Sequence, residues 1–389
     1  MAIRVPVVST ARTPFTRAAK GELKDTRPDT LAALAIKEAL ARARGVEPSA
    51  VEDVVLGCAM PEAEQGMNVA RLAALLAGIP ETVPAMTINR FCSSGVQSIA
   101  LVAQSIAAGS IDLGVAGGTE SMTMVPMGGN KPSANPELME AHPEIYTSMG
   151  ATAELVARKF EISRQAQDEF ALQSQQRAAA AKEAGKLKEE LFPVTTRVHD
   201  QDGRPSQVTV TFDTIMRPDT TAEGLAKLKP AFDAQGTVTA GNASPLTDGA
   251  AAVVLASEAK VKALGLAPLG YFVDLQVAGV PPEIMGIGPV PAVRKLLAKN
   301  DLKVSDIDLF ELNEAFASQS LYCIRELGLD REKVNVNGGA IALGHPLGVS
   351  GARMTGALLR ELKRRGGKYG VVTMCIGGGM GAAALFSAA

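Results

Sequence analysis

Two stretches repeat one pattern within the chain and decide its fold: Gly249-Ala250-Ala251-Ala252-Val253-Val254-Leu255 and Gly381-Ala382-Ala383-Ala384-Leu385-Phe386. Working outward, two more pairs recur in the same order at an offset of about 255 residues, 53–58 with 308–313 and 95–114 with 351–370. Short apolar runs that follow helical stretches indicate parallel strands in βαβ units. The sequence therefore predicts an α/β fold made of two duplicated halves.

One long segment distinguishes the two halves. In the second half the last repeated strand follows Cys375 almost at once, whereas residues 119–248 separate the equivalent strands of the first half. We therefore divide the chain into an N-terminal half, an inserted loop domain and a C-terminal half, which span residues 1–118 with 249–268, 119–248 and 269–389. We expect the insertion to cover the functional face, with a decorative surface insert as the alternative. Within it, residues 163–188 predict a long, solvated helix because they are rich in Gln, Ala, Glu and Lys.

Composition narrows the class of protein. The 389 residues carry a formal net charge of −2, which gives no electrostatic support for binding nucleic acid or an acidic membrane. The sequence has no run of 18 apolar residues, so we expect no membrane span, and its N-terminus does not resemble a secretory signal. We expect a cytoplasmic enzyme, with an organelle matrix as the alternative location.

The cysteines favour reduced thiols. Cys58, Cys92, Cys323 and Cys375 form no C-x-x-C pair, and none is spaced with a histidine in the way that zinc ligands are. Without a secretory context, disulfides are not expected either. We therefore predict no metal site and regard one or two of these thiols as candidates for chemistry.

Cys92 has the most informative surroundings of the four. The helix predicted after it is apolar nearly all round over residues 96–107, which is typical of a buried helix. Cys92 then lies at or just before a helix N-terminus, where free N–H groups favour the thiolate over the thiol. The alternative is an inert core cysteine.

Three more polar residues stand at predicted strand ends or turns. His345 lies in the glycine-rich segment 337–351, which resembles a phosphate cradle but matches neither nucleotide-binding motif. Cys375 ends a strand before the glycines 377–379, whose N–H groups can face an oxyanion. Asn313 follows a strand and offers an amide that can hold a water or a carbonyl. Taken singly, each has a structural alternative.

The duplication predicts that these residues lie close together. Ligands of open parallel sheets bind beyond the carboxyl ends of the strands, and two related halves can face one pocket. Cys92, Asn313, His345 and Cys375 all stand at such junctions. Two thiols, an imidazole and an amide suit covalent acyl transfer, in which His activates a thiolate and a second thiol shuttles a proton.

Five motifs resemble those of the thiolase family, in the same order and across essentially the whole chain: NRFCSSG (89–95), AGNASPLTDGAAA (240–252), NEAF (313–316), GGAIALGHPLGVSGAR (338–353) and CIGGGMG (375–381). The resemblance implies the thiolase fold, with two halves in a five-layer αβαβα arrangement and an inserted loop domain. It also implies coenzyme A as a substrate and no metal or redox cofactor.

The resemblance assigns roles to the candidate residues. Cys92 would hold the acyl group, and His345 would activate it. With a water held by Asn313, His345 would also stabilise the enolate oxygen of acetyl-CoA. Cys375 would exchange the proton at C2 of acetyl-CoA, and the N–H groups of Cys92 and Gly377 would form a second oxyanion hole.

The implied reaction is the reversible thiolytic cleavage of 3-ketoacyl-CoA, as in β-oxidation. The residues expected to contact CoA and its pantetheine arm are Met149, Arg217, Phe232, Ser244 and Phe316. The form of the Cys92 motif, and the absence of a histidine beside Met149, resemble degradative enzymes of broad chain length. An acetoacetyl-CoA-forming acetyltransferase is the first alternative and a ketoacyl synthase the second. The family implies a homodimer or homotetramer.

Overall fold

The computed structural model describes residues 3–389, and its two halves repeat one order of elements. The first half contains β1 (Val5–Arg12), β2 (Thr16–Arg17), α1 (Pro28–Arg42), β3 (Asp53–Gly57), α2 (Val69–Leu76), β4 (Ala85–Ile88), α3 (Ser94–Ala107), β5 (Leu113–Ser121), β8 (Thr247–Ala256) and α8 (Glu258–Leu264). The second half contains β9 (Gly270–Gly279), α9 (Pro289–Lys299), β10 (Leu309–Leu312), α10 (Ala317–Leu327), α11 (Ala340–Leu343), α12 (Ser350–Arg365), β11 (Tyr369–Ile376) and β12 (Met380–Ala388).

Strand pairing confirms the duplication. The order is β1-β8-β5-β3-β4 in the first half and β9-β12-β11-β10 in the second, while the short β2 pairs with β8. In both halves the strand that follows the central helix runs parallel to its neighbour, as β5 does to β3 and β11 to β10. Strands β1 and β9 pair over Val5–Phe272, Pro6–Tyr271 and Val7–Gly270, which joins both halves into one hydrogen-bonded path.

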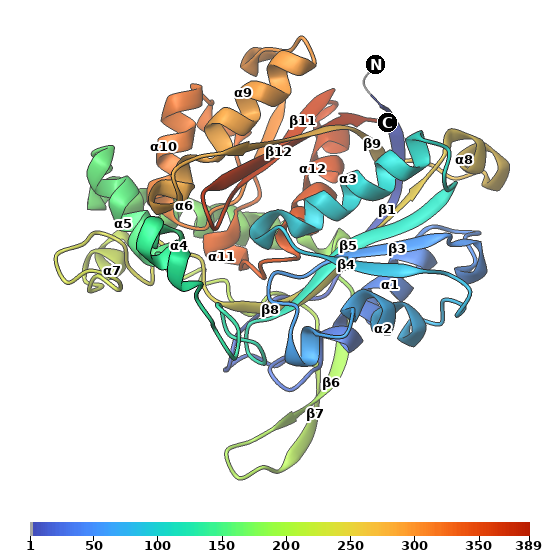
Figure 1. The fold of residues 1–389 in the computed structure, drawn as a ribbon, viewed down its shortest axis with the longest axis horizontal. Helices are drawn as coiled ribbons and strands as arrows, with labels where there is room; N and C mark the ends of the chain where they lie inside the picture. The colour runs from blue at the N-terminus through green and yellow to red at the C-terminus, as the bar shows by residue number, and fades with distance from the viewer. Residues whose placement is uncertain (1–2) are drawn as a thin grey trace.

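The predicted five layers are confirmed by the packing on either side of the strands. Helices α1 and α2 cover the outer face of the first half, α9 and α10 cover that of the second, and α3 and α12 lie between (Figure 1). Along β8, Val253 faces the central helices while Val254 faces α1 and α2. Along β11, Val372 faces the central helices and Val371 the outer ones. Both strands are apolar on two faces because helices bury each face.

The two central helices touch at their N-termini. A Cβ at Gly95 of α3 would lie 2.9 Å from the nitrogen of Ala352, and one at Gly351 of α12 would collide with the backbone of Val96. Glycine at both positions therefore allows the backbones to meet without side chains between them. This contact brings together the two turns that precede α3 and α12.

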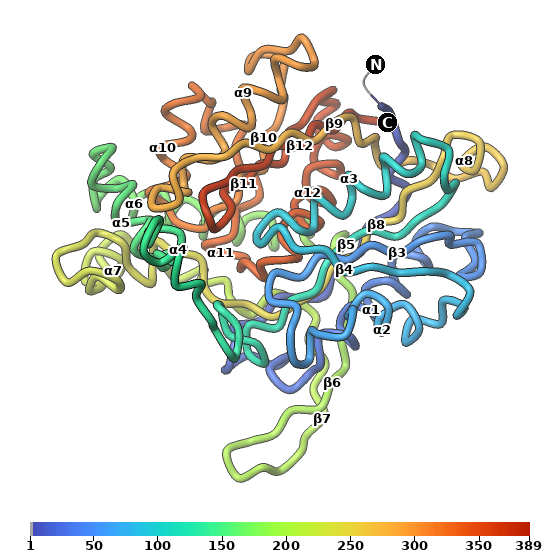
Figure 2. The backbone as a smooth tube through the Cα atoms, viewed as in Figure 1, coloured from blue at the N-terminus to red at the C-terminus, as the bar shows by residue number. Residues whose placement is uncertain are grey.

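The segment between β5 and β8 carries its own elements. These are α4 (Pro136–Ala141), α5 (Met149–Lys159), α6 (Arg164–Glu183), β6 (Val194–His199), β7 (Pro205–Val210) and α7 (Ala222–Ala226). The β6–β7 hairpin extends away from the body of the molecule (Figure 2). Near the flanking strands, the segment is fixed by Arg12 of β1, which forms buried ion pairs with Glu190 at 2.9 Å and Asp213 at 2.6 Å.

The prediction of a solvated helix over residues 163–188 is wrong in extent and environment. Helix α6 ends at Glu183, and its buried side chains include Phe170, Ala171 and Ala178. It packs against α10 and α11, so one side of a polar sequence closes the core of the second half. The prediction failed because it used the overall composition of the helix, which is mostly polar, although one narrow face of the helix is apolar.

Within residues 3–389, no helix is both long and apolar enough to cross a membrane. Among the same residues, no group of three or more His, Cys, Asp and Glu side chains is placed to hold a metal ion.

Candidate active site

A cavity of about 540 Å³ opens where the strand ends of both halves meet the inserted segment. Cys92, His345 and Cys375 all line it. Asn313 does not line it but lies directly behind His345, with its amide Nδ2 at 3.2 Å from His345 Nε2. The structure therefore brings the four predicted side chains together. Residues from both halves contribute to one cavity, as the sequence predicted.

Cys92 is held in a tight turn between β4 and α3. The turn is a short 3-10 helix, Phe91–Ser93, in which Phe91 has a left-handed φ of 43°. The carboxamide of Asn89 accepts the N–H of Phe91 at 2.8 Å, and the hydroxyl of Ser94 accepts the N–H of Arg90 at 2.8 Å. Strain at a non-glycine residue, held in place by such bonds, is typical of functional turns.

The thiol of Cys92 is less acidic than the sequence predicted. Burial raises its pKa to about 12, while the backbone N–H groups of Gly377 and of Cys92 itself act in the opposite direction. The helix start favours the thiolate as expected but contributes too little to outweigh the loss of solvent, so Cys92 rests as a thiol. Removal of the proton therefore needs a base.

His345 lines the same cavity with a defined ring tautomer. Its Nδ1 lies 2.6 Å from Ser350 Oγ, and Ser350 Oγ donates to the carbonyl of Pro346 at 3.1 Å. Because Ser350 has a single proton, this network assigns the ring proton to Nδ1 and leaves Nε2 as the acceptor, where Asn313 donates. Burial and the charge of Arg353 lower the pKa of His345 to about 4, so the ring is neutral at pH 7.

The environment of Asn313 is rigid. Its N–H donates to the carbonyl of Thr373 at 2.9 Å, and its own carbonyl accepts from Gln319 Nε2 at 3.2 Å. A small cavity of about 10 Å³, close to the volume that one water needs, lies beside Asn313, Ser350 and Arg353. The side chain of Asn313 is thus fixed against His345 from a strand end of the second half.

Cys375 is fully buried near the end of β11, where it pairs with Gly381 of β12. Burial raises its pKa, and the neighbouring thiols of Cys92 and Cys323 raise it further. Cys375 is therefore a protonated acid at rest, next to the other thiol. The glycines after it form a turn in which Gly378 and Gly379 have φ of 82° and 83°.

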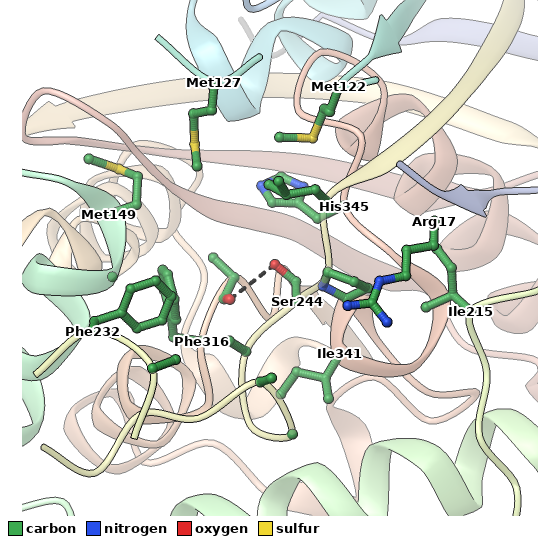
Figure 3. Close-up of a pocket in the computed structure, with 18 of the residues that line it drawn as sticks. Arg17, Met122, Met127, Met149, Ile215, Phe232, Ser244, Phe316, Ile341 and His345 are labelled. Carbon is green, nitrogen blue, oxygen red and sulfur yellow. Dashed lines mark hydrogen bonds between the residues drawn. The ribbon is translucent and has the colours of Figure 1, made fainter. Parts of the chain in front are cut away.

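All five residues expected to contact CoA line the same cavity: Met149, Arg217, Phe232, Ser244 and Phe316. The rings of Phe232 and Phe316 meet edge to face at 6.0 Å, and the hydroxyl of Ser244 donates to the carbonyl of Ala315 at 3.0 Å. In the view of Figure 3, His345 lies between Met122 and Met127 on one side and Ser244 and Phe316 on the other. The cavity therefore combines apolar walls with one imidazole edge.

Sequence reasoning missed three residues that support this site: Glu120, Glu314 and Ser350. Glu120 and Glu314 are buried carboxylates at 0 % and 2 % exposure, bonded to backbone N–H groups around His345. A glutamate inside an otherwise apolar or glycine-rich strand, as at Glu120, is the signal that points to such a role.

Comparison with known proteins agrees with this geometry. Residues 5–259 match the model described as "Thiolase, N-terminal domain", and residues 266–388 match "Thiolase, C-terminal domain". The 3-ketoacyl-CoA thiolase of Bacillus subtilis is 55% identical over 384 residues, which cover 98% of each chain.

Three solved structures superpose over nearly the whole chain. They are the acetyl-CoA acetyltransferase of Bacillus anthracis (TM-score 0.90, 44% identity, 100% of this chain and 99% of that one), human mitochondrial 3-ketoacyl-CoA thiolase in complex with CoA (TM-score 0.90, 44% identity, 100% and 99%), and the dimeric peroxisomal thiolase of Saccharomyces cerevisiae (TM-score 0.88, 43% identity, 99% and 97%). With its duplicated halves, its paired thiols and both domain models matched, the chain belongs to the thiolase family.

Proposed function

We propose that this protein cleaves 3-ketoacyl-CoA by thiolysis, giving acetyl-CoA and an acyl-CoA shortened by two carbons. The observation that carries the proposal is the convergence of Cys92, His345 and Cys375 on one cavity, with the Asn313 amide on His345. The similarity to 3-ketoacyl-CoA thiolases over 98% of the chain supports it.

The first half of the reaction forms an acyl-enzyme. His345 Nε2 takes the proton of Cys92, and the thiolate attacks the 3-keto carbon of the substrate. The N–H groups of Cys92 and Gly377 stabilise the oxyanion that forms there, as their approach to the Cys92 sulfur supports. The bond between C2 and C3 then breaks, and its electron pair gives the enolate of acetyl-CoA.

The second half returns the enzyme to its starting state. Protonated His345 and Asn313 stabilise the enolate oxygen, and the thiol of Cys375 gives its proton to C2. After acetyl-CoA leaves, the Cys375 thiolate takes the proton of an incoming CoA thiol. The CoA thiolate attacks the acyl-Cys92 thioester, and Cys92 recovers its proton from His345. Protons and electrons balance within these side chains, so we propose that no metal or redox cofactor takes part.

The test is direct. The purified protein, given a 3-ketoacyl-CoA and CoA, should form acetyl-CoA and the shortened acyl-CoA, which mass spectrometry identifies. An intermediate trapped without CoA should carry the acyl group on Cys92. No product, or hydrolysis to a free acid in place of a second thioester, would contradict the proposal.

An acetyl-CoA acetyltransferase that acts only on acetoacetyl-CoA is the alternative, favoured by the likeness to the Bacillus anthracis enzyme. Against it, five methionines line the cavity: Met122, Met127, Met149, Met216 and Met285. Methionine is unbranched and flexible, so such walls adapt to ligands of different shape. A series of 3-ketoacyl-CoA substrates from four to sixteen carbons separates the two, because activity confined to the shortest one would establish the alternative.

We also propose that the protein works as a homo-oligomer, at least a dimer, in the cytoplasm or an organelle matrix. The similarity to the dimeric peroxisomal thiolase of Saccharomyces cerevisiae supports both the dimer and the organelle location. The edge strand β4 lies open at the end of the sheet path, and the nearby side chains of Met67 and Met86 are 89% and 42% exposed. Light scattering from the purified protein measures the number of subunits.

A further inference from the structure

His345 stands in a glycine-rich segment in which only α11, Ala340–Leu343, is regular secondary structure. Residues 339–348, here called the histidine loop, include Gly339, Gly344 and Gly348. Between its ends, the N–H of His345 donates to Thr247 Oγ1 at 3.1 Å. Burial of Ile341, Leu343 and Leu347 fixes part of this segment. Its glycines keep backbone freedom that bonds from outside the segment must restrict. Two buried glutamates, one from each half of the molecule, supply these bonds.

Glu120 of β5 holds the end of the loop from the first half. Its Oε2 accepts the N–H of Gly348 at 2.8 Å and the N–H of Ala59 at 2.8 Å. Its Oε1 accepts the N–H of Met60 at 3.2 Å and the side-chain amide of Gln65 at 2.9 Å. A Cβ at Gly348 would lie 2.9 Å from Glu120 Oε2, so glycine is needed for this approach.

Glu314 holds the start of the loop from the second half. Its Oε2 accepts the N–H of Ile341 at 3.2 Å and the hydroxyl of Ser174 at 2.6 Å, and its Oε1 accepts Asn335 Nδ2 at 2.8 Å. Gly339 packs so closely on the carboxyl group that a Cβ there would collide with it. Ile341, the residue that Glu314 binds, and His345, which lies between Ile341 and Gly348, both line the cavity (Figure 3).

We propose that Glu120 and Glu314 are positioning residues that together fix His345 against Cys92, an inference that rests on the proposed function. Neither glutamate lines the substrate cavity, and both oxygens of each carboxyl group accept hydrogen bonds from the protein. Glutamine keeps the shape of glutamate but replaces one acceptor oxygen with an NH₂ group. Each oxygen of Glu120 accepts two N–H groups. In Glu120→Gln, the new NH₂ group would therefore point at two N–H donors in either orientation, and these buried donors would lose their acceptor.

The experiment compares Glu120→Gln and Glu314→Gln with a matched control, Glu154→Gln. Glu154 is also buried and accepts backbone N–H groups, from Thr237 at 2.9 Å and Val238 at 2.8 Å, but it does not bind the histidine loop. In both test variants kcat should fall by about 10- to 100-fold, the usual cost of a displaced catalytic group, with the KM for CoA unchanged. The control should keep the wild-type kcat.

A second readout does not depend on turnover. Mass spectrometry can follow the rate at which iodoacetamide alkylates Cys92 as the pH is raised. In the test variants the midpoint of this pH profile should shift to higher pH, because His345 no longer assists deprotonation of Cys92. The same midpoint as in wild type, together with wild-type kcat in both folded test variants, would overturn the proposal. So would equal shifts in Glu154→Gln.

Two features keep the result decisive. If Glu120→Gln fails to fold, Glu120→Asp, which keeps the charge but withdraws it by one methylene, and Glu314→Gln carry the same expectations. If the wild-type protein cleaves no 3-ketoacyl-CoA, the proposed function fails, whereas the alkylation midpoints still decide whether the two glutamates position His345.

Discussion

The two halves of the molecule share one set of strand ends but use them differently. After β3 the first half places Cys58, and after β10 the second half places Asn313. Cys58 is fully buried against Glu120 and does not line the cavity, whereas Asn313 bonds His345. Equivalent positions therefore carry a thiol outside the cavity in one half and an amide bonded to His345 in the other.

The same division holds at two other places. Cys92, before α3, corresponds in position to Gly348, before α12. Glu120 of β5 pairs with Gly249 of β8, and Cys375 of β11 pairs in the same way with Gly381 of β12. The first half thus contributes Cys92 and Glu120 to the site. The second contributes His345, Asn313, Cys375 and Glu314. Duplication supplied the positions, and the chemistry was then divided between the copies.

The largest effect should separate the two cysteines of the first half. Cys92→Ala removes the nucleophile, and kcat should fall by at least about 10⁴-fold, the scale seen when an enzyme loses its covalent group. Cys58→Ala, the matched control, should keep kcat near wild type. Mass spectrometry of the enzyme trapped with a 3-ketoacyl-CoA should show the acyl group on Cys92. Its appearance on Cys58 or Cys323 would reverse the comparison.

The next effect sharpens the contrast between Cys375 and its neighbour Cys323. Cys375→Ser should slow exchange of the C2 protons of acetyl-CoA by about 10²- to 10⁴-fold, because a hydroxyl is a poor acid and base at neutral pH. Acylation of Cys92 should slow far less. Proton exchange followed by NMR measures the first, and a stopped-flow acylation assay the second. Cys323→Ala should affect neither, and equal losses in both steps would refute the assignment of Cys375.

The duplication was readable from the sequence because small residues repeat at fixed spacing wherever backbones approach closely. Gly95 and Gly351 are examples, since their equal spacing to the next strand indicated the repeat, and the structure places both at the α3–α12 contact. The pKa of Cys92 was not readable, because burial outweighs a local helix start. Nor were the hydrogen bonds of Glu120 and Glu314, whose partners lie up to 228 residues away along the chain. Local pattern predicts elements, whereas electrostatics and polar networks depend on tertiary neighbours.

A third effect tests the buried state of His345 through stability. Its pKa in the folded protein is lowered from 6.5 to about 4, so the unfolded chain binds the proton more readily between these values. Stability should therefore fall as pH drops from about 6.5 to about 4, by about 3 kcal/mol in total. Urea unfolding across this range measures the loss. His345→Asn should lose much of this acid dependence, whereas the exposed His142→Asn should retain it. An unchanged profile in His345→Asn would contradict the burial argument.

The smallest effect compares two serines at equivalent helix starts, Ser94 of α3 and Ser350 of α12. Ser94 Oγ closes the Cys92 turn by accepting the N–H of Arg90, whereas Ser350 Oγ contacts Nδ1 of His345. Ser350→Ala should lower kcat by about tenfold, because the ring proton is then free to move to Nε2, the atom that must accept the Cys92 proton. Stability should change little.

Ser94→Ala should show the opposite balance. The free energy of unfolding should fall by about 1 kcal/mol, the usual net contribution of one hydrogen bond, because the N–H of Arg90 loses its acceptor. The kcat should fall less than in Ser350→Ala, because the His345 tautomer is untouched. Urea unfolding and steady-state kinetics on both variants give the comparison. Equal kinetic losses would mean that the two serines act alike, through the packing of α3 on α12, and not through the separate groups that each half contributes.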